Sequence, residues 1–278
     1  MEEFSTRHRR LFLIYYIIIF YILAVYNWLS GMFLYQLQPI LFHTPFDGTS
    51  WLLMQTGIHQ WLLTNRAGCL FFDTVFYMTP LTFWWFCEKK RVISPLLFGI
   101  CWTTFNWLYV LCYVLFPSTS VEKFLPALLL PILFATTSIT SFYYLMHGLR
   151  YFFLFFFVST GIWKLRTEAV FNIEQTSGIL LLQHKEFLIA SPRHWYSAFL
   201  YWLIRNPYLS YFLYLAATIV ELTFVIGFFT KKYDKQLFFL LVFFFAANFI
   251  LMRIPFFEIL PLALPLLFSR STLKAPLQ

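Results

Sequence analysis

Long, nearly unbroken apolar stretches alternate along this chain with short connections that carry most of the charged residues. Several stretches approach or exceed the roughly 18–20 residues that a helix needs to cross the hydrocarbon core of a bilayer. Within the stretches the apolar positions are continuous, so they lack the period-two alternation of a membrane β-barrel strand. The pattern therefore predicts an all-α protein, a polytopic bundle of transmembrane helices.

We expect about eight membrane segments, or seven if one proline-bearing stretch does not cross. Their bounds are 11–35, 69–87, 92–116, 124–140, a fifth that passes 147–150 and ends at 164, then 208–229, 236–252 and 254–268. Pro126 and Pro131 interrupt backbone hydrogen bonding in the fourth segment, so we expect it to pack against neighbouring helices. The eighth carries Pro255, Pro261 and Pro265 and can be a tilted span or a broken one.

The connections on one side of the membrane hold the longer polar stretches. Residues 51–63 are typical of a short amphipathic helix at the outer interface, with tryptophans at the level of the headgroups. Residues 166–205 form the longest extramembrane segment, which we also place outside. Within it, 174–188 and 195–204 predict two further amphipathic helices.

Charge fixes the predicted orientation. Only 12% of the residues are charged, against roughly 25% in a soluble domain. The basic clusters at 7–10, 89–91, 231–235 and 270–274 all fall on one side of the eight-segment arrangement, and this side is predicted to be cytoplasmic. We therefore expect an integral membrane protein with both termini in the cytoplasm and a single domain over 1–278. The net charge of +8 reflects topology and does not indicate nucleic-acid binding.

Ionisable residues inside the predicted membrane segments fall into two layers. The outer layer contains Asp73, Lys164, Arg253 and Glu258, and the inner layer contains His147, Arg150 and Glu221. Each such group costs roughly 2.5–3.5 kcal/mol to insert, so it should face the bundle and find a partner. The pattern allows two pairs, Asp73 with Lys164 and Arg150 with Glu221.

These charges have more than one interpretation. Opposite charges can simply tie helices together and specify one packing, which suits the inner pair. The outer layer borders the long external segment, where a pocket open to that side can form, and Lys164 there can act as a proton acceptor. Alternatively, Lys164 and Arg166 extend into the lipid headgroups.

Most known chemical motifs are missing from the sequence. The histidines show no spacing typical of a metal site, and no phosphate-binding glycine loop, nucleophile elbow or haem-attachment motif is present. We therefore expect no bound metal.

Two stretches carry a resemblance. Residues 149–165, which end in Ser-Thr-Gly-Ile-Trp-Lys-Leu, resemble a signature of DoxX-like proteins and of the HTTM family, the membrane domain of vitamin K-dependent γ-carboxylase and its bacterial relatives. In both groups a helix ends in a small residue, glycine and a lysine-leucine pair before an outer loop. Residues 221–230, Glu-Leu-Thr-Phe-Val-Ile-Gly-Phe-Phe-Thr, look like the helix that follows that loop in DoxX-like proteins.

The resemblance implies that Lys164 occupies the position of the lysine that acts as a base on a reduced quinone, beside a flat apolar pocket. The sequence departs from the carboxylase pattern after the lysine, at 166–170, and at 105–107, where the catalytic histidine region has no counterpart. These departures speak against γ-carboxylation itself.

We therefore predict a pocket near the outer leaflet that binds a quinone or a similar lipid-soluble molecule in a redox-linked role. Lys164 and Asp73 are the candidate catalytic residues, and Arg253, Glu258 and Trp163 are the candidate binding residues. One alternative is a non-enzymatic scaffold that holds a membrane or periplasmic partner through 166–205. Another is a transporter, since proline-broken segments resemble the broken helices of transporter sites.

Overall fold

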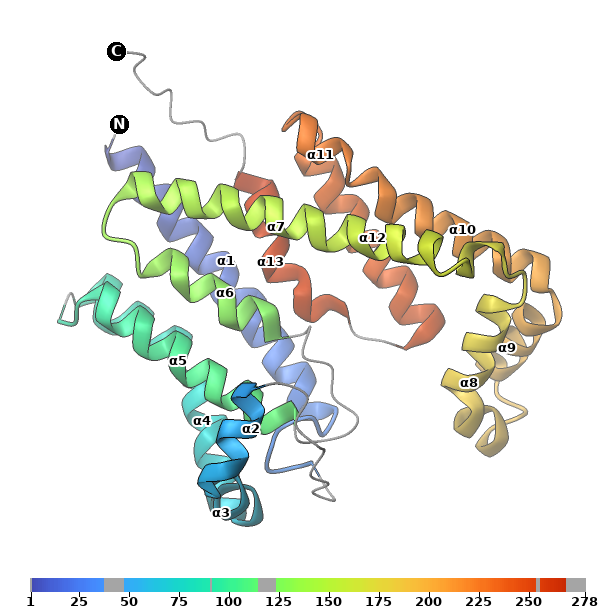
Figure 1. Cartoon of the computed structure of the whole chain (residues 1–278), viewed down its shortest axis with the longest axis horizontal. Coiled ribbons are helices and arrows are strands. Elements are labelled where there is room, and N and C mark those ends of the chain that lie inside the picture. The colour runs from blue at the N-terminus through green and yellow to red at the C-terminus, as the bar shows by residue number, and fades with distance from the viewer. Residues whose placement is uncertain (1, 38–47, 91, 115–123, 254–255, 269–278) are drawn as a thin grey trace. The chain divides into compact units, whose positions relative to one another are not determined.

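The computed structural model describes residues 2–37, 48–90, 92–114, 124–253 and 256–268 (Figure 1). Within these ranges the regular structure is helical, without a strand, which confirms the all-α prediction. The predicted basic cluster at 270–274 and part of the connection after the first span lie outside the described residues.

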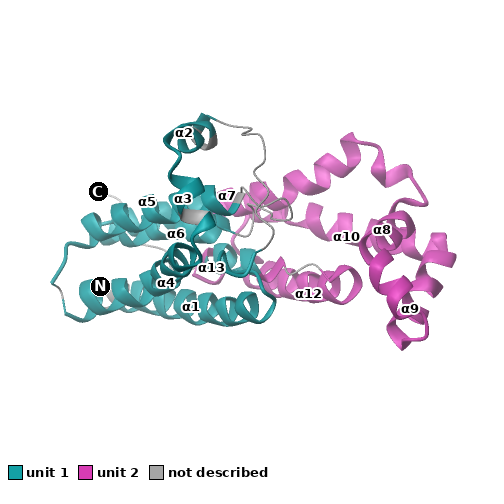
Figure 2. Cartoon of the chain, turned by 90° about the horizontal axis from the view of Figure 1, so that it is seen from below, with its two compact units in different colours: residues 1–149, 258–264 teal, residues 150–257, 265–278 magenta. Residues whose placement is uncertain are grey.

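The chain separates into two compact units (Figure 2). The first unit contains Met1–Leu149 and Glu258–Leu264, and the second contains Arg150–Phe257 and Pro265–Gln278. That the whole chain acts as a single domain remains a prediction.

The first unit is built mainly from the N-terminal half of the chain. Its elements are α1 (Glu2–Leu29), α2 (Gly48–Thr56), α3 (Ile58–Thr64), α4 (Arg66–Phe83), the π-helical turn η1 (Trp84–Lys89), α5 (Pro95–Val114), α6 (Leu125–Phe134), the first part of α7 (Ile139–Arg166), the second half of η4 (Phe256–Ile259) and the first part of α13 (Leu260–Phe268). The short helices α2 and α3 cover the region where the sequence predicts an interfacial helix.

The second unit holds the predicted external segment and the spans around it. Its main elements are the rest of α7, η3 (Ala169–Phe171), α8 (Gln175–Ala190), α9 (Trp195–Arg205), α10 (Pro207–Thr223), α11 (Ile226–Phe229) and α12 (Asp234–Met252). Helices α8 and α9 occupy the two stretches in which the sequence predicts helices. Helix α9 is amphipathic as predicted, whereas α8 is not, because it exposes Leu181, Leu182 and Ile189.

Among the described residues, five helices are long and apolar enough to cross a membrane, as an integral membrane protein requires. They cover Arg7–Leu29, Pro95–Tyr113, Ile139–Arg166, Pro207–Phe229 and Asp234–Met252. Less than half of each span is buried against the rest of the protein, and large apolar side chains such as Phe229, Phe239 and Phe243 are exposed. Continuous exposed apolar surface of this kind is suited to contact with lipid.

The count of seven or eight spans is not confirmed. Helix α6 has only 10 residues, about 15 Å of helical rise, and is half the length that a bilayer core of about 30 Å demands. The chain turns after Phe134, and the Ser138 hydroxyl accepts a hydrogen bond from the Ser141 amide at the start of α7. The eighth segment is likewise divided, between η4 and the short helix α13.

The first span also ends earlier than the hydrophobic run suggests. Helix α1 stops at Leu29, and Gly31 adopts a positive φ of 69°, which glycine tolerates without steric cost. The chain that follows is held by Asp73 of α4, whose Oδ1 and Oδ2 accept hydrogen bonds from the amides of Leu34 and Tyr35 at 3.1 and 3.0 Å. A buried side chain therefore ends the span where hydropathy alone would continue it.

A close backbone approach in the first unit lies between α5 and the end of α6. A Cβ atom on Gly99 would lie 2.6 Å from Ala135 Cβ and 3.1 Å from Ala135 Cα. Aromatic side chains fill the interior of this unit; the rings of Trp102 and Phe134, for example, stack with their centroids 6.4 Å apart. Because the obstacle includes backbone, it cannot move aside as a flexible side chain would.

We expect Gly99→Ala to destabilise the protein by about 1–3 kcal/mol, the usual cost of overpacking. The measurement is the thermal unfolding midpoint of the purified protein in detergent. Gly148→Ala in α7 is the matched control, because its Cβ would meet nothing within 4 Å, and the gain in helix propensity should leave stability equal or higher. Equal midpoints for Gly99→Ala and wild type would contradict the close packing.

Candidate functional site

The lysine singled out from the sequence lies in an ion pair between two membrane helices. Lys164 stands in the last turn of α7, and its Nζ donates to Glu221 Oε1 of α10 at 2.8 Å. The side chains are 23% and 8% exposed, so Lys164 is partly accessible while the carboxylate is almost fully covered. The ring of Tyr214 lies 5.0 Å from the ammonium nitrogen, within the range of a cation–π contact.

Gly161 allows this pair to form. It stands one turn before Lys164, and a Cβ there would lie 2.9 Å from Leu222 Cδ2 and 3.3 Å from Glu221 Cβ. The absence of a side chain therefore lets α10 approach α7 closely at this point, as small residues do in membrane helix packing. The glycine and lysine of the sequence signature thus serve one contact.

One oxygen of this pair has unused bonding capacity. Glu221 Oε2 is buried and, by hydrogen-bond geometry, has no donor among the described residues, although Thr160 lies close enough to interact with this carboxylate. The neighbouring Thr160 hydroxyl donates to the Phe157 carbonyl at 2.6 Å. A buried acceptor in this state is costly, so a ligand hydroxyl placed there would be stabilised.

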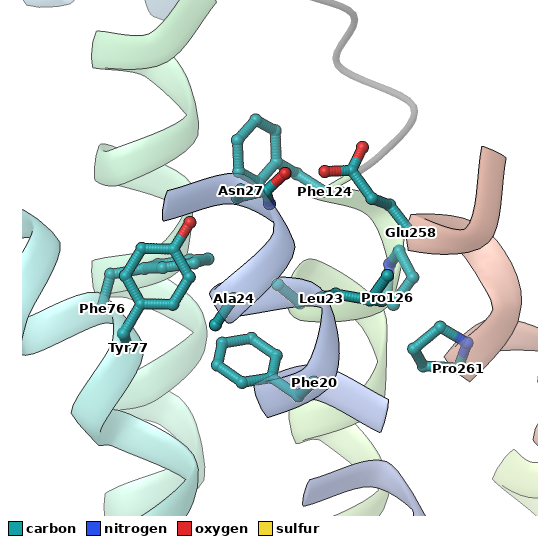
Figure 3. A pocket seen from close by; sticks show the side chains of 11 residues that line it. Phe20, Leu23, Ala24, Asn27, Phe76, Tyr77, Phe124, Pro126, Glu258 and Pro261 are labelled. Carbon is teal, nitrogen blue, oxygen red and sulfur yellow. The ribbon is translucent and has the colours of Figure 1, made fainter. Parts of the chain in front are cut away.

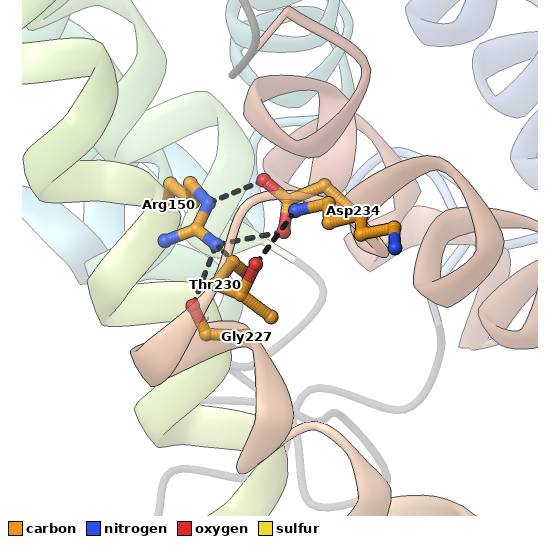
Figure 4. Close-up of polar contacts among 5 residues, drawn as sticks. Arg150, Gly227, Thr230 and Asp234 are labelled. Carbon is orange, nitrogen blue, oxygen red and sulfur yellow. Dashed lines mark hydrogen bonds and ion pairs between the residues drawn. The ribbon is translucent and has the colours of Figure 1, made fainter.

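A second ion pair joins α7 to the start of α12 (Figure 4). Arg150 donates from Nε to Asp234 Oδ2 at 2.7 Å and from Nη2 to Asp234 Oδ1 at 2.7 Å. The same Nη2 reaches the Gly227 carbonyl at 2.6 Å and the Thr230 carbonyl at 3.4 Å. Both charged side chains are fully buried. This bidentate arrangement ties the turn between α11 and α12 to α7.

Gly227 lies where the segment that holds Asp234 packs against α7, as Gly161 does at the first ion pair. A Cβ on Gly227 would lie 2.6 Å from Leu154 Cδ2, one turn along α7 from Arg150. Every donor and acceptor of the two charged side chains except Arg150 Nη1 is used among the described residues, and the cluster is closed to solvent. We therefore regard Arg150 and Asp234 as structural.

The partners predicted from the sequence were wrong for both cations. Lys164 pairs with Glu221, not with Asp73, and Arg150 pairs with Asp234, not with Glu221. The two cations are fourteen residues apart on α7, about 21 Å and almost four whole turns. They therefore share one face of the helix at different depths, and a single carboxylate cannot serve both. The sequence does not mark Asp234 as a partner for a membrane cation, because it lies within the basic cluster at 231–235.

Asp73 has a different set of neighbours in the first unit. It is buried, and besides the two amides after α1 it accepts the Tyr109 hydroxyl at 2.6 Å. Neutral donors from two other parts of the unit therefore converge on this one carboxylate. The arrangement is that of a structural clamp, and a catalytic role for Asp73 remains a prediction.

The three predicted binding residues lie in separate surroundings. Trp163 is exposed beside Lys164, and the Arg166 guanidinium lies 5.5 Å from its ring. Arg253 lies against the rings of Phe187 and Tyr196 in the second unit, at 4.3 and 4.6 Å. Glu258 belongs to the first unit, where it lines a small pocket (Figure 3).

Within the described parts of the chain, no group of three histidine, cysteine, aspartate or glutamate side chains is placed to hold a metal ion. Of the arrangements present, the Lys164–Glu221 pair alone combines a partly accessible cation with a buried, unsatisfied acceptor among the described residues. It is the candidate functional site.

We expect Asp234→Asn to destabilise the protein by about 3–5 kcal/mol, because it leaves the Arg150 charge buried without its counterion. The measurement is the thermal midpoint in detergent. Glu88→Gln is the matched control, since the Arg9–Glu88 pair at 3.0 Å has both side chains 21% exposed and should contribute at most about 1 kcal/mol. Similar midpoints for the two variants would refute the structural role assigned to Arg150.

Comparison with family models, curated proteins and solved structures finds no match to this chain. The resemblance to DoxX-like and HTTM proteins consequently rests on residues 149–165 and 221–230. The function has to be inferred from the chemistry of the site itself.

Proposed function

We propose that this chain is a bacterial inner-membrane protein of the DoxX or HTTM type that binds a quinone or a similar lipid-soluble redox molecule beside the Lys164–Glu221 pair. The observation that carries the proposal is the buried, unsatisfied Oε2 of Glu221 next to a partly exposed ammonium. A quinone changes between carbonyl and hydroxyl oxygens when it is reduced, so its site needs both a donor and an acceptor.

The pair supplies these two functions within a few ångströms. The Lys164 ammonium has three N–H donors and uses one on Glu221 Oε1, so a quinone carbonyl can accept another. A quinol hydroxyl can donate to Glu221 Oε2. In this proposal the proton acceptor is the Lys164–Glu221 pair as a unit, where the sequence suggests Lys164 with Asp73.

The surroundings suit a ligand that arrives through lipid. Ile162 and Trp163, immediately before the lysine, are exposed and apolar, and Tyr214 presents a ring beside the ammonium. An aromatic headgroup can stack on such rings while its tail stays in the bilayer. Arg253 and Glu258 have other neighbours, so we assign them no contact with this ligand.

A non-enzymatic scaffold is the second candidate function. Leu182, Ile189 and Trp195 of α8 and α9 are exposed, and they lie in the segment that the sequence offers as a docking surface. Purification in mild detergent separates the two functions, because a scaffold would retain a stoichiometric protein partner and no quinone.

The proposed orientation places Glu174 on the periplasmic side of the membrane and Lys232 in the cytoplasm. Both side chains are exposed, so a cysteine at either position should be accessible. In a variant with Cys101, the exposed cysteine, changed to serine, a membrane-impermeant maleimide should label Glu174→Cys in intact cells. It should label Lys232→Cys only after permeabilisation. The reverse pattern would overturn the orientation.

We expect Lys164→Met and Glu221→Gln each to weaken binding of a short-chain quinone by about 10–100-fold, the worth of a charge-assisted hydrogen bond. Quenching of tryptophan fluorescence in detergent measures the affinity. Lys185→Met, on the exposed part of α8, is the matched control and should bind as wild type does.

Because Lys164→Met strands a buried carboxylate, the double variant with Glu221→Gln tests whether lost binding reflects lost folding. It should regain stability without regaining affinity. Unchanged quinone affinity in both Lys164→Met and Glu221→Gln would contradict the proposal.

A further inference from the structure

A separate pocket lies wholly within the first unit. It is formed by the last turns of α1, by α4, by the start of α6 and by η4 with α13 (Figure 3), and its cavity volume is about 40 Å³. Neither Lys164 nor Glu221 lines it, so a ligand in this pocket would be independent of the proposed quinone site.

Rings form one wall of this pocket. Phe20, Phe76 and Tyr77 lie with ring centroids 5.0–5.9 Å apart, and Phe124 meets Phe76 edge-on at 6.1 Å. Because each ring is held by its neighbours, the wall is preorganised. The face of an aromatic ring carries partial negative charge and attracts cations.

Two polar side chains complete the lining. Glu258 and Asn27 are both nine-tenths or more buried, and their oxygen atoms lie at the edge of the group of side chains drawn in Figure 3. A buried carboxylate is stabilised by a cation that hydrogen-bonds to it. Aromatic rings, a carboxylate and an amide oxygen are together the groups that recognise an organic ammonium ion.

The size of the pocket selects among such ions. A site for one water needs roughly 10–15 Å³, whereas a cavity that holds a benzene ring is nearer 150 Å³. A cavity of about 40 Å³ therefore admits an –NH₃⁺ group with its first carbon atoms, but not a quinone ring. A quaternary ammonium with four carbon substituents is also too large.

We propose that this pocket binds a primary ammonium group, with Glu258 as its counterion, Asn27 as a second acceptor and the rings of Phe20, Phe76 and Tyr77 around its carbon atoms. The rest of the ligand leaves through the open side of the pocket. The same chemistry is offered by a free small amine and by the headgroup of phosphatidylethanolamine.

Binding to the full-length purified protein tests the proposal. The probes are methylammonium, ethanolamine and tetramethylammonium, measured by calorimetry in detergent, and phosphatidylethanolamine, counted by native mass spectrometry from nanodiscs that otherwise contain phosphatidylglycerol. Binding of the two primary amines supports a free-amine ligand, and retention of phosphatidylethanolamine alone supports a lipid headgroup. Binding of neither, or equal binding of tetramethylammonium, overturns the proposal.

Variants locate the binding. Glu258→Gln should weaken binding at least about tenfold, because a charge-assisted bond becomes a neutral one, and Phe20→Leu should weaken it about threefold by removing one ring face. Glu186→Gln on the exposed side of α8 is the matched control and should bind as wild type does. If Glu258→Gln does not fold, the affinity of Phe20→Leu still tests whether the ammonium group binds in this pocket. Unchanged affinity in the variants that fold would overturn that location.

Discussion

A charged side chain inside a bilayer must find its counterion within the protein, and this constraint shapes the second unit. Helix α7 carries Arg150 and Lys164 on one face, at two depths, and each would cost several kcal/mol if left facing lipid. Each meets a carboxylate on a different element, Asp234 at the start of α12 and Glu221 within α10. The two pairs thereby fix which face of α7 turns inwards and how far α10 and α12 lie along it.

Glycine makes both pairs geometrically possible. Helices that bring short carboxylates to long basic side chains must approach closely, and at Gly161 and Gly227 a β-carbon would collide with a neighbouring leucine. In lipid, close packing of this kind replaces the hydrophobic effect as the force between helices. The ion pairs therefore supply the attraction, and the glycines supply the space that it requires.

The sequence predicted the helical class and the spans at 208–229 and 236–252 closely, because continuous apolar runs bounded by basic clusters are a strong local signal. It overestimated the fourth segment: the prolines marked 124–140 as interrupted, but the apolar run does not show that the helix ends at Phe134 and that the chain turns there. It also overextended α1, because the clamp on the residues after Leu29 comes from Asp73, far along the chain. The predicted ion pairs of Lys164 and Arg150 were wrong because the sequence does not show how deep in the bundle each carboxylate lies.

The two candidate sites differ in the surroundings of their carboxylates, and this difference governs the ligand that each favours. In the second unit Glu221 faces an ammonium, so the pair is neutral overall and suits an uncharged ligand that exchanges hydrogen bonds, such as a quinone. In the first unit Glu258 lines a pocket whose other lining residues are an amide, a phenol and apolar side chains. A cation that enters this pocket meets a carboxylate and aromatic rings together. Ligand class thus follows from the chemistry of the groups that line each site: an ammonium with a carboxylate in one, and a carboxylate with aromatic rings in the other.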